Sequence, residues 1–480
     1  MSGISEHGLH LFKELDRNNI RYCHWKNNQT VEEGLRGEDD LDILVARDDA
    51  QSFFQVLLAF GFHEAENRYM KVPFVYHYYG LDEHTGVILH IHVYLKLYTG
   101  ESHTKNFHFP FEKQLLESSN QRISGCPVPS WEWQLFIYLV RYYLKISCVI
   151  GFILLYSRQS EFKREYKRII DELDEVAWDA LVSNMRAPFS VQTIESLRMA
   201  FNEKGPNIRS VLLGISLRWR LFAWRRRGVF RDMSSRYSQI LYRVINKYLL
   251  HQKKRLVRGG AVIAITGFDG TGKTTTCSEL EHWFGKQFDV RLDHFGRPKA
   301  KLITLPLRIM IGMYRSWKRK KHFTSPVSKK DGVIAAIRYC SLAFERYSVL
   351  RRSAMLRDKG YVVILDRYPS LTTGGMDSPQ LKSTVETGYI YRFFERLEGW
   401  LYSSMPQADL LLVLEVPVET ALLRNQKRIK KFKESDDELL ARHVDNQGLE
   451  YEANVIKTID VTSSLDETMK VIKSSVWSAL

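Results

Sequence analysis

The chain of 480 residues contains few cysteines, and they do not occur in the spacings typical of cysteine-based sites. Its five cysteines are scattered along the sequence, and no two of them form a C-x-x-C pair. This pattern excludes a disulfide framework and a zinc site of the usual spacing. We therefore expect reduced thiols, as in a cytoplasmic protein.

The chain also lacks a recognisable secretory signal and a long uninterrupted apolar run. Its first residues, M-S-G-I-S-E-H, do not combine a basic start with an apolar core. The most apolar stretch, residues 134–156, is interrupted by Arg141 and Lys145. We interpret it as a buried helix, with a membrane span as the alternative. No internal repeat or low-complexity tract is evident.

The positive charge of the chain, +15 in total, is concentrated in two segments. Residues 218–258 contain thirteen Lys or Arg and one acid, and residues 299–330 contain ten Lys or Arg and no acid. The remainder of the chain is net acidic. Such local concentration of charge predicts a polyanionic partner: nucleic acid, anionic lipid or a phosphorylated substrate.

Residues 267–274, G-F-D-G-T-G-K-T, match the phosphate-loop pattern G-x-x-x-x-G-K-[ST] at every fixed position. An apolar run of strand type precedes them at 261–266, and a helical pattern follows at 274–287. Backbone amides of such a loop, together with the helix N-terminus, bind phosphate oxygens. Lys273 is expected to reach the β- and γ-phosphates, and the Thr274 hydroxyl to coordinate Mg²⁺. The sequence therefore predicts a site for a nucleoside triphosphate.

Beyond the loop, strands and helices alternate up to the C-terminus, which predicts a parallel sheet with helices on both faces. The further strands are expected at 290–295, 361–365, 410–416 and 455–461, and the main helices at 335–358, 418–428 and 465–477. Because ligands of such folds bind at the carboxyl ends of the strands, functional residues are expected there.

Residues 259–480 resemble the thymidylate kinase family of phosphate-loop nucleoside monophosphate kinases. The resemblance depends on Asp269 within the loop, on Asp366-Arg367-Tyr368 at a strand end, and on the strand at 410–416 with the helix after it. It implies ATP and Mg²⁺ as cofactors. The ATP-binding residues that it implies are Gly267, Asp269, Gly270, Thr271, Gly272, Lys273, Thr274, Thr275 and Arg424.

The same resemblance assigns further roles. Asp366 would order the Mg²⁺ shell, and Arg367 would bind phosphate at the transfer site. The residues implied to bind the acceptor are Asp269, Arg297, Arg346, Arg367 and Tyr368. Arg428, with Lys430 and Lys431, would close over the phosphates as part of a basic lid at 427–433. The catalytic set is then Lys273, Asp366, Arg367 and Arg428.

Two departures from the family concern the acceptor. Leu342 stands where the family places a phenylalanine on thymine, and the segment after Tyr368 does not match the thymine pocket. We therefore expect an ATP-dependent kinase whose acceptor is a nucleoside monophosphate resembling dTMP. The alternative acceptor is a phosphorylated sugar or a lipid-linked glycan of surface-polysaccharide synthesis, because the chain as a whole resembles bacterial two-domain proteins associated with that function.

Residues 1–125 are predicted to form a small α/β domain with helices at 6–17 and 48–60 and strands at 20–25, 41–46 and 86–97. Asp48 and Gln51 suggest a capping box for the second helix. Asp40 and Asp42 lie two apart on an incipient strand, so both carboxylates are expected on one face, where paired acids can hold Mg²⁺.

With Trp25-Lys26 upstream, the acid pair and the residues after it resemble the nucleotidyltransferase superfamily, which adds a third carboxylate from a later strand. Here that strand has His90 and His92 instead. Nucleotidyl transfer is one interpretation of the acid pair; a degenerate fold whose acids only cap and solubilise is the other. The two histidines are expected to be surface residues, with metal binding as the alternative.

Residues 126–258 are predicted to be mainly helical and to connect the two α/β domains. Their last part, 217–250, combines arginines with aromatic residues, as membrane-surface helices do. Binding to an anionic membrane through 217–250 and 299–330, and packing on the kinase domain, are the main alternatives. Nucleic acid is the weaker one, because no known motif accompanies the charge. A homodimer and peripheral attachment to the inner membrane face stay open.

Overall fold

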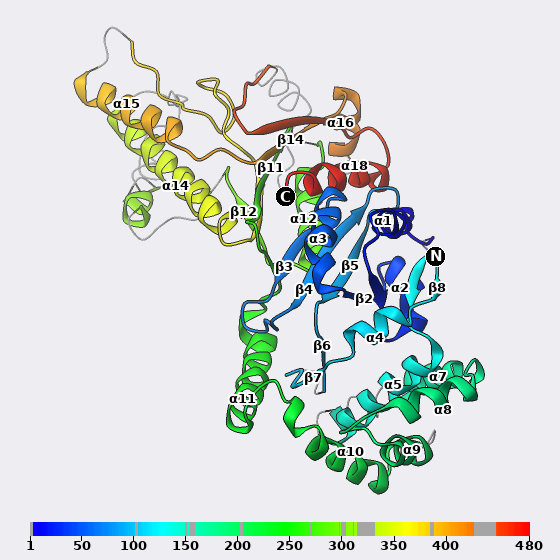
Figure 1. Cartoon of the computed structure of the whole chain (residues 1–480). Helices are drawn as coiled ribbons and strands as arrows, with labels where there is room; N and C mark the ends of the chain where they lie inside the picture. Colours follow the sequence, from blue (N-terminus) through cyan, green and yellow to red (C-terminus); the bar gives the residue numbers. More distant parts are fainter. Residues whose placement is uncertain are drawn as a thin grey trace. The chain divides into compact units, whose positions relative to one another are not determined.

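The computed structural model describes residues 3–100, 104–148, 151–153, 159–201, 205–268, 270–296, 298, 304–310, 312–313, 332–384, 388–426 and 448–480. The chain divides into two compact units, Met1–Gln252 and Lys253–Leu480 (Figure 1). Asp269, Arg297 and Arg428 lie outside the described residues, as do the proposed lid at 427–433 and most of the basic segment 299–330.

The first unit contains a mixed sheet with the strand order β1-β2-β5-β4-β3. Strands β2 and β5 are parallel, whereas β1/β2, β4/β5 and β3/β4 are antiparallel. The strands are β1 Tyr22–His24, β2 Leu41–Val45, β3 His63–Glu66, β4 Val75–Asp82 and β5 Val87–Tyr94. Strands β1, β2 and β5 were predicted from the sequence, but β3 and β4 were not. Strand β3 lies between a helix and a turn, and β4 lies between two turns; neither has clear apolar alternation.

Helices α1 Glu6–Arg17, α2 Val31–Leu35 and α3 Ala50–Ala59 belong to this part of the chain, followed by α4 Glu112–Glu117. Two short hairpins, β6 Leu97–Thr99 with β7 Phe107–Phe109 and β8 Gln121–Ile123 with β9 Cys126–Val128, flank α4. The predicted capping box at Asp48 is wrong, because a 3₁₀ turn, Arg47–Asp49, precedes α3. The neighbouring Asp49 accepts hydrogen bonds from the backbone N and the Nε of Arg21, at 2.9 and 2.8 Å.

The remainder of the first unit is helical, as predicted: α5 Trp131–Ile146, α7 Gln159–Asp171, α8 Glu175–Asn184, α9 Val191–Ala200, α10 Ile208–Arg220 and α11 Val229–Ile245. Helix α5 is buried on nearly all sides, in one hydrophobic cluster with Trp25, which follows β1, and Tyr94 of β5. The interpretation of its apolar run as a buried helix is confirmed for this part. Its Arg141 donates a hydrogen bond to Asn27 Oδ1 at 2.9 Å. Across the described parts of the chain, no helix combines the length and apolar character needed to cross a membrane.

The second unit contains the predicted parallel sheet, with the strand order β12-β13-β11-β14-β15. The strands are β11 Ala261–Gly267, β12 Val290–His294, β13 Val362–Asp366, β14 Leu410–Glu415 and β15 Val455–Asp460. The helices are α12 Lys273–Gly285, α14 Val333–Arg357, α15 Tyr389–Ser403, α16 Val418–Gln426 and α18 Leu465–Trp477. Among these, α15 was not predicted.

Both faces of the central strand β11 are buried. Val262 and Ala264 share a cluster with Leu350 of α14. Because successive side chains of a strand point to opposite faces, Ile263 and Ile265 face the other side, and they are also fully buried. The register pairs Ile265 of β11 with Asp366 of β13, and Asp366 with His294 of β12. The carboxyl ends of three strands therefore bring Gly267, His294 and Asp366 to one edge of the sheet.

Candidate functional sites

The glycine loop between β11 and α12 depends on backbone conformations that suit glycine. Gly267, Gly270 and Gly272 have φ angles of 147°, 93° and 88°. A Cβ on Gly267 would lie 2.4 Å from Leu414 O, so another residue there would force the loop away from β14. The glycines thus keep the loop close against the sheet, with no side chains between its main chain and a ligand.

Helix α12 begins directly after this loop, and Gly272 at its N-cap has no side chain that could cap the first amides. Thr274 and Thr275 are exposed in its first turn, whereas Lys273 is buried. The Lys273 Nζ donates hydrogen bonds to Gly267 O at 2.9 Å and Phe268 O at 2.6 Å. An ammonium group and a helix N-terminus are therefore held at one point, which is an arrangement that suits an anion.

Asp366 ends β13 beside this loop. Burial alone would raise the pKa of its carboxyl, but the hydrogen bond and charge of His294, with the charges of Arg367 and Lys273, hold that pKa below its ordinary value. The Asp366 Oδ2 lies 3.2 Å from His294 Nδ1. Its Oδ1 is buried and accepts no hydrogen bond from any described residue. The carboxylate is thus ionised and has one oxygen available for a cation.

Arg346 and Arg367 converge on one carboxylate, that of Asp377. The Arg346 Nη2 lies 2.5 Å from Asp377 Oδ1, and the Arg367 Nη1 lies 3.4 Å from Oδ2. Arg346 is buried, donates a second hydrogen bond to the Tyr402 hydroxyl at 2.6 Å, and lies over the Phe295 ring. Both arginines were predicted from the sequence, whereas Asp377 and His294 were not, because neither belongs to a recognisable motif.

Tyr368 follows Asp366 and Arg367 directly after the end of β13. Its side chain is buried in the core, where its hydroxyl donates to Glu452 O at 2.8 Å and accepts from Ala408 N at 3.0 Å. The predicted contact of Tyr368 with the acceptor stays a prediction. Arg424 on α16 donates a hydrogen bond to Val461 O at 2.7 Å. Its expected role in ATP binding stays a prediction.

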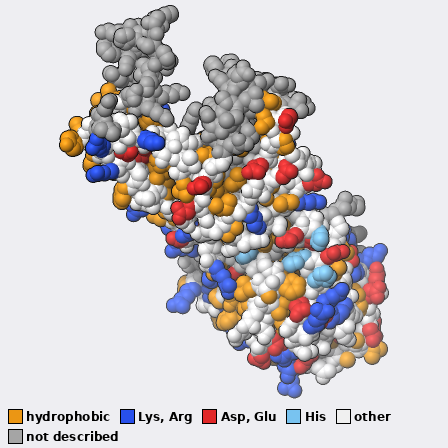
Figure 2. All heavy atoms as spheres, turned by 90° about the horizontal axis from the view of Figure 1, so that it is seen from above, with side chains coloured by type: hydrophobic (Ala, Val, Ile, Leu, Met, Phe, Trp, Pro, Cys, Tyr) orange, Lys and Arg blue, Asp and Glu red, His pale blue; other side chains and the backbone are white. Residues whose placement is uncertain are grey.

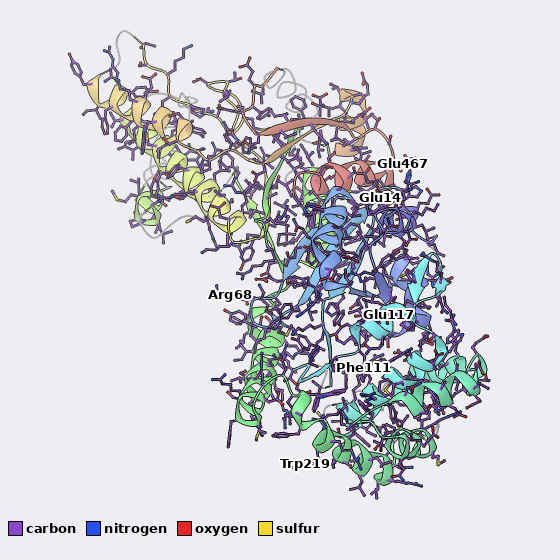
Figure 3. The ribbon with its side chains drawn as sticks, in the orientation of Figure 1. Glu14, Arg68, Phe111, Glu117, Trp219 and Glu467 are labelled. Atoms are coloured by element: carbon purple, nitrogen blue, oxygen red, sulfur yellow. The ribbon has the colours of Figure 1, made fainter. Side chains whose placement is uncertain are left out.

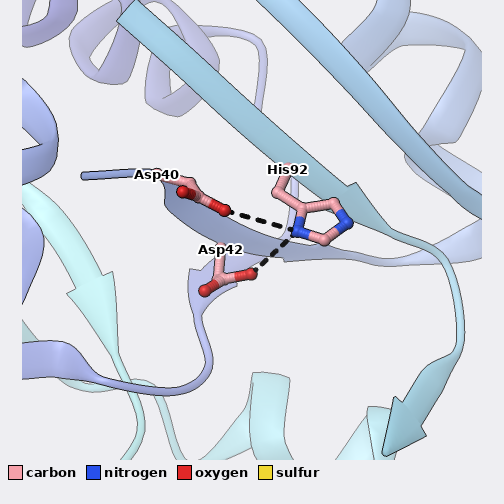
Figure 4. Close-up of side chains that lie close together, drawn as sticks. All are labelled: Asp40, Asp42 and His92. Atoms are coloured by element: carbon pink, nitrogen blue, oxygen red, sulfur yellow. Dashed lines mark ion pairs between the residues drawn. The ribbon is translucent and has the colours of Figure 1, made fainter. Parts of the chain in front are cut away.

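The first unit contains a second cluster of ionisable groups, formed by Asp40, Asp42 and His92 (Figure 4). The parallel pairing of β2 with β5 places Asp42 beside His92. The Nδ1 of His92 lies 3.2 Å from Asp42 Oδ1 and 3.8 Å from Asp40 Oδ2. One ligand atom from each of the three residues lies within 4.8 Å of the others. Both carboxylates thus face the same point, as their spacing predicts.

The histidines of β5 are not the surface residues that sequence analysis expected. The side chains of His90 and His92 are only 14% and 9% exposed, and His77 of the unpredicted strand β4 stacks on His92. Burial and the nearby Lys105 lower the pKa of His92 to about 3, so its ring is neutral at pH 7. A neutral imidazole with two carboxylates is a donor set that suits Mn²⁺ or Zn²⁺ as well as Mg²⁺.

Two lysines supply positive charge beside these acids. The Lys26 Nζ lies 2.8 Å from Asp42 Oδ1, and Lys105 donates to the Tyr94 hydroxyl at 2.8 Å. Burial and the charge of Lys26 lower the pKa of Lys105 to about 7. Lys26 was visible in the sequence only as part of the Trp25-Lys26 pair. No sequence signal indicated Lys105, because it lies far from the acids along the chain.

Comparison with known proteins identifies no matching family model and no matching curated protein. A solved structure of thymidylate kinase from Candida albicans matches with 20% identity, 46% of this chain and 92% of that chain covered, and a TM-score of 0.29. At this TM-score and identity, the likeness does not establish a common fold or activity.

Proposed function

We propose that the second unit is a phosphotransferase that uses a nucleoside triphosphate, with ATP as the donor. The observation that carries this proposal is the placement of Lys273 and the glycine loop beside Asp366, at the carboxyl edge of a parallel sheet. Phosphoryl transfer requires cations and N–H donors around the phosphates and little covalent help from the protein.

In this proposal, the loop amides and Lys273 bind the donor phosphates. The Asp366 Oδ1, which accepts no hydrogen bond from the described residues, and the exposed Thr274 hydroxyl are the groups that would hold Mg²⁺. The ion would neutralise charge on the transferred group. Arg346 and Arg367 would receive the acceptor. Their common partner Asp377 keeps both guanidinium groups in place, and an acceptor phosphate is an anion that could compete for them.

The acceptor that we propose first is a nucleoside monophosphate resembling dTMP. The alternative is a phosphorylated sugar or a lipid-linked glycan. Purified protein would be incubated with γ-labelled ATP, Mg²⁺ and each acceptor class separately, and the labelled product identified by mass spectrometry. Transfer to phosphosugars or glycans without transfer to any monophosphate would reject the first acceptor.

The Lys273→Ala variant provides the negative control for that screen. We expect transfer to fall about a thousandfold, because the lost ammonium stabilises charge on the phosphates. Lys359→Ala removes an exposed lysine of the same unit and should leave the rate unchanged. Equal rates for Lys273→Ala and the wild type would reject the kinase, and absence of transfer to any acceptor would favour a protein that binds ATP without using it.

A second candidate function, nucleotidyl transfer by the first unit, is favoured by the convergence of Asp40, Asp42 and His92. Paired carboxylates can hold a divalent ion that activates a hydroxyl and orients a triphosphate. Under this proposal, Asp40→Asn with Asp42→Asn abolishes release of pyrophosphate from a nucleoside triphosphate, and Lys273→Ala does not. Loss of pyrophosphate release in Lys273→Ala alone would reject it.

A further inference from the structure

Helices α10 and α11 of the first unit expose apolar side chains in regular rows. On α10, the row repeats every three or four residues and comprises Ile208, Leu212, Ile215 and Trp219, which are 41–81% exposed. On α11 and the π-helical turn after it, Asn246–Leu250, the row comprises Phe230, Met233, Tyr237, Leu241, Val244 and Tyr248, which are 45–89% exposed. We call these rows the α10 stripe and the α11 stripe. A spacing of three and four places each row along one side of its helix.

The opposite side of α11 is polar and buried, which is the reverse of an ordinary surface helix. Asp232 and Gln239, seven residues apart, are 1% and 8% exposed. Asp232 forms an ion pair with Arg225 at 2.8 Å and accepts a hydrogen bond from Asn106 Nδ2 at 3.2 Å. The helix is thus attached to its own unit through polar groups, and its apolar side faces outward.

Other aromatic residues of the first unit lie in its core and not in the stripes. Phe111 packs against Trp133, Phe136, Phe189 and Trp224. Trp219, at the end of α10, is 73% exposed (both are labelled in Figure 3). The unit therefore already has an aromatic core, and the stripes add apolar surface outside it. Exposed apolar rows on two helices of one unit are the kind of surface that marks an interaction site.

The charged residues around the stripes indicate which kind of partner the stripes would bind. Between positions 208 and 250 there are ten Lys or Arg and a single acid, the buried and paired Asp232. The basic side chains at the exposed positions include Arg209, Arg220, Arg231 and Lys247. Figure 2 shows acidic and basic side chains interspersed on the face that it presents. The segment of the stripes is therefore complementary to an anionic surface that also accepts apolar groups.

We infer that the α10 and α11 stripes bind the surface of an anionic lipid bilayer. Apolar side chains enter the boundary between headgroups and acyl chains, and the surrounding arginines and lysine contact lipid phosphates. The α10 stripe contains a tryptophan and the α11 stripe contains tyrosines, and both residue types favour that boundary. A second copy of the chain is a less suitable partner, because it would bring two basic segments together. Nucleic acid is also less suitable, because it would leave the aliphatic side chains of the rows without apolar contacts.

The test is flotation of the full-length protein with vesicles of phosphatidylcholine alone and vesicles with about one third phosphatidylserine. Wild-type protein is expected to bind the anionic vesicles and much less the neutral ones. Leu241→Glu places a carboxylate in the middle of the α11 stripe and should lower the partition coefficient about tenfold or more, since it removes an apolar contact and adds repulsion. Phe230→Ser, at a side chain that is 89% exposed, should also lower the partition coefficient, although it introduces no charge.

Val176→Glu is the matched control, because Val176 is an apolar residue of α8 that is 78% exposed outside both stripes. It should bind like the wild type. Thermal unfolding of each variant verifies that the fold is retained. The inference is overturned if Leu241→Glu and Phe230→Ser bind like the wild type, or if the wild type binds neither vesicle. It is also overturned if the wild type forms a dimer that Leu241→Glu dissociates, because a second copy then covers the stripe.

Discussion

The two units contain candidate sites that are built in different ways. The site of the second unit is made mainly of main chain, with one lysine bonded to loop carbonyls and one carboxylate from a neighbouring strand. The site of the first unit is made of side chains that satisfy one another, with Lys26 on Asp42 and His92 between the two acids. A loop of amides recognises phosphate in general, whereas converging side chains select a cation.

The histidines of the two sites also differ. In the first unit, burial lowers the pKa of His24 and His92, so these rings are neutral within the fold. In the second unit, the hydrogen bond to Asp366 raises the pKa of His294. Burial and the neighbouring groups therefore decide whether an imidazole is a neutral donor, as in the first unit, or a counter-ion, as in the second unit.

The largest expected effect is on the rate of phosphoryl transfer, and it distinguishes the two sites. Asp366→Asn should reduce phosphoryl transfer by about a thousandfold, because it removes the charge that would hold the donor's Mg²⁺. Asp358→Asn, at a side chain that is 66% exposed, should not change the rate. A single-turnover assay with labelled ATP measures both. If Asp42→Asn lowered this same rate as strongly, the two sites would not be independent.

The next effect concerns stability in the first unit. Lys26→Met should destabilise it by about 3–5 kcal/mol, because the buried Asp42 carboxylate then loses its cation. Lys71→Met breaks the ion pair of Lys71 with Glu66, whose side chains are 61% and 32% exposed, and should cost about 0–1 kcal/mol. Urea unfolding monitored for each variant gives both values. Equal losses would mean that the buried pair contributes no more than the exposed one.

The main-chain site should be sensitive to glycine replacement. Gly267→Ala should destabilise the second unit by about 2–3 kcal/mol and weaken nucleotide binding, since its Cβ would meet Leu414 O. Gly285→Ala is the control, because a Cβ there meets no atom within 4 Å. Thermal unfolding with and without ATP measures both effects. An unchanged unfolding temperature for Gly267→Ala would show that the loop is not held against β14 in solution.

The smallest effect is a difference in pH dependence. The folded pKa of His24 lies below its ordinary value of 6.5, so the unfolded state binds its proton more readily. Acidification through about pH 6.5 should therefore destabilise the first unit, by at most about 1.4 kcal/mol per pH unit for this residue. The folded pKa of His294 is raised, so the stability from its pair with Asp366 is fully present below pH 6.5 and is lost as the pH rises through the folded pKa.

Hydrogen exchange followed by mass spectrometry at about pH 7.5 and 5.5, corrected for the intrinsic rates, resolves the two units. We expect protection to fall on acidification in peptides of β1 and β2 and to be retained in those of β12 and β13. His24→Gln should flatten the dependence of the first unit. An unchanged slope in that variant would show that His24 does not titrate on unfolding.

Patterns that are local in the chain could be predicted well. The loop at 267–274 and the strands of the second unit follow from contiguous motifs and apolar runs, and α1 and α18 begin and end where their patterns predict. The convergence of Asp40 and Asp42 follows from strand periodicity alone. The burial and hydrogen bonds of the Tyr368 side chain could not be predicted, because its motif indicates a position in the chain and not the direction of the side chain.

The sequence by itself determined the alternation of strands and helices in the second unit, the glycine loop and the basic segment around 218–258. These depend on backbone preferences, periodicity and charge, which are properties of neighbouring residues. Only the tertiary structure decided that His92 lies against the two acids, that Asp377 joins Arg346 to Arg367, and that the apolar rows of α10 and α11 face outward. Each of these depends on which distant segments pack together, and burial changes both the pKa and the role of the residues involved.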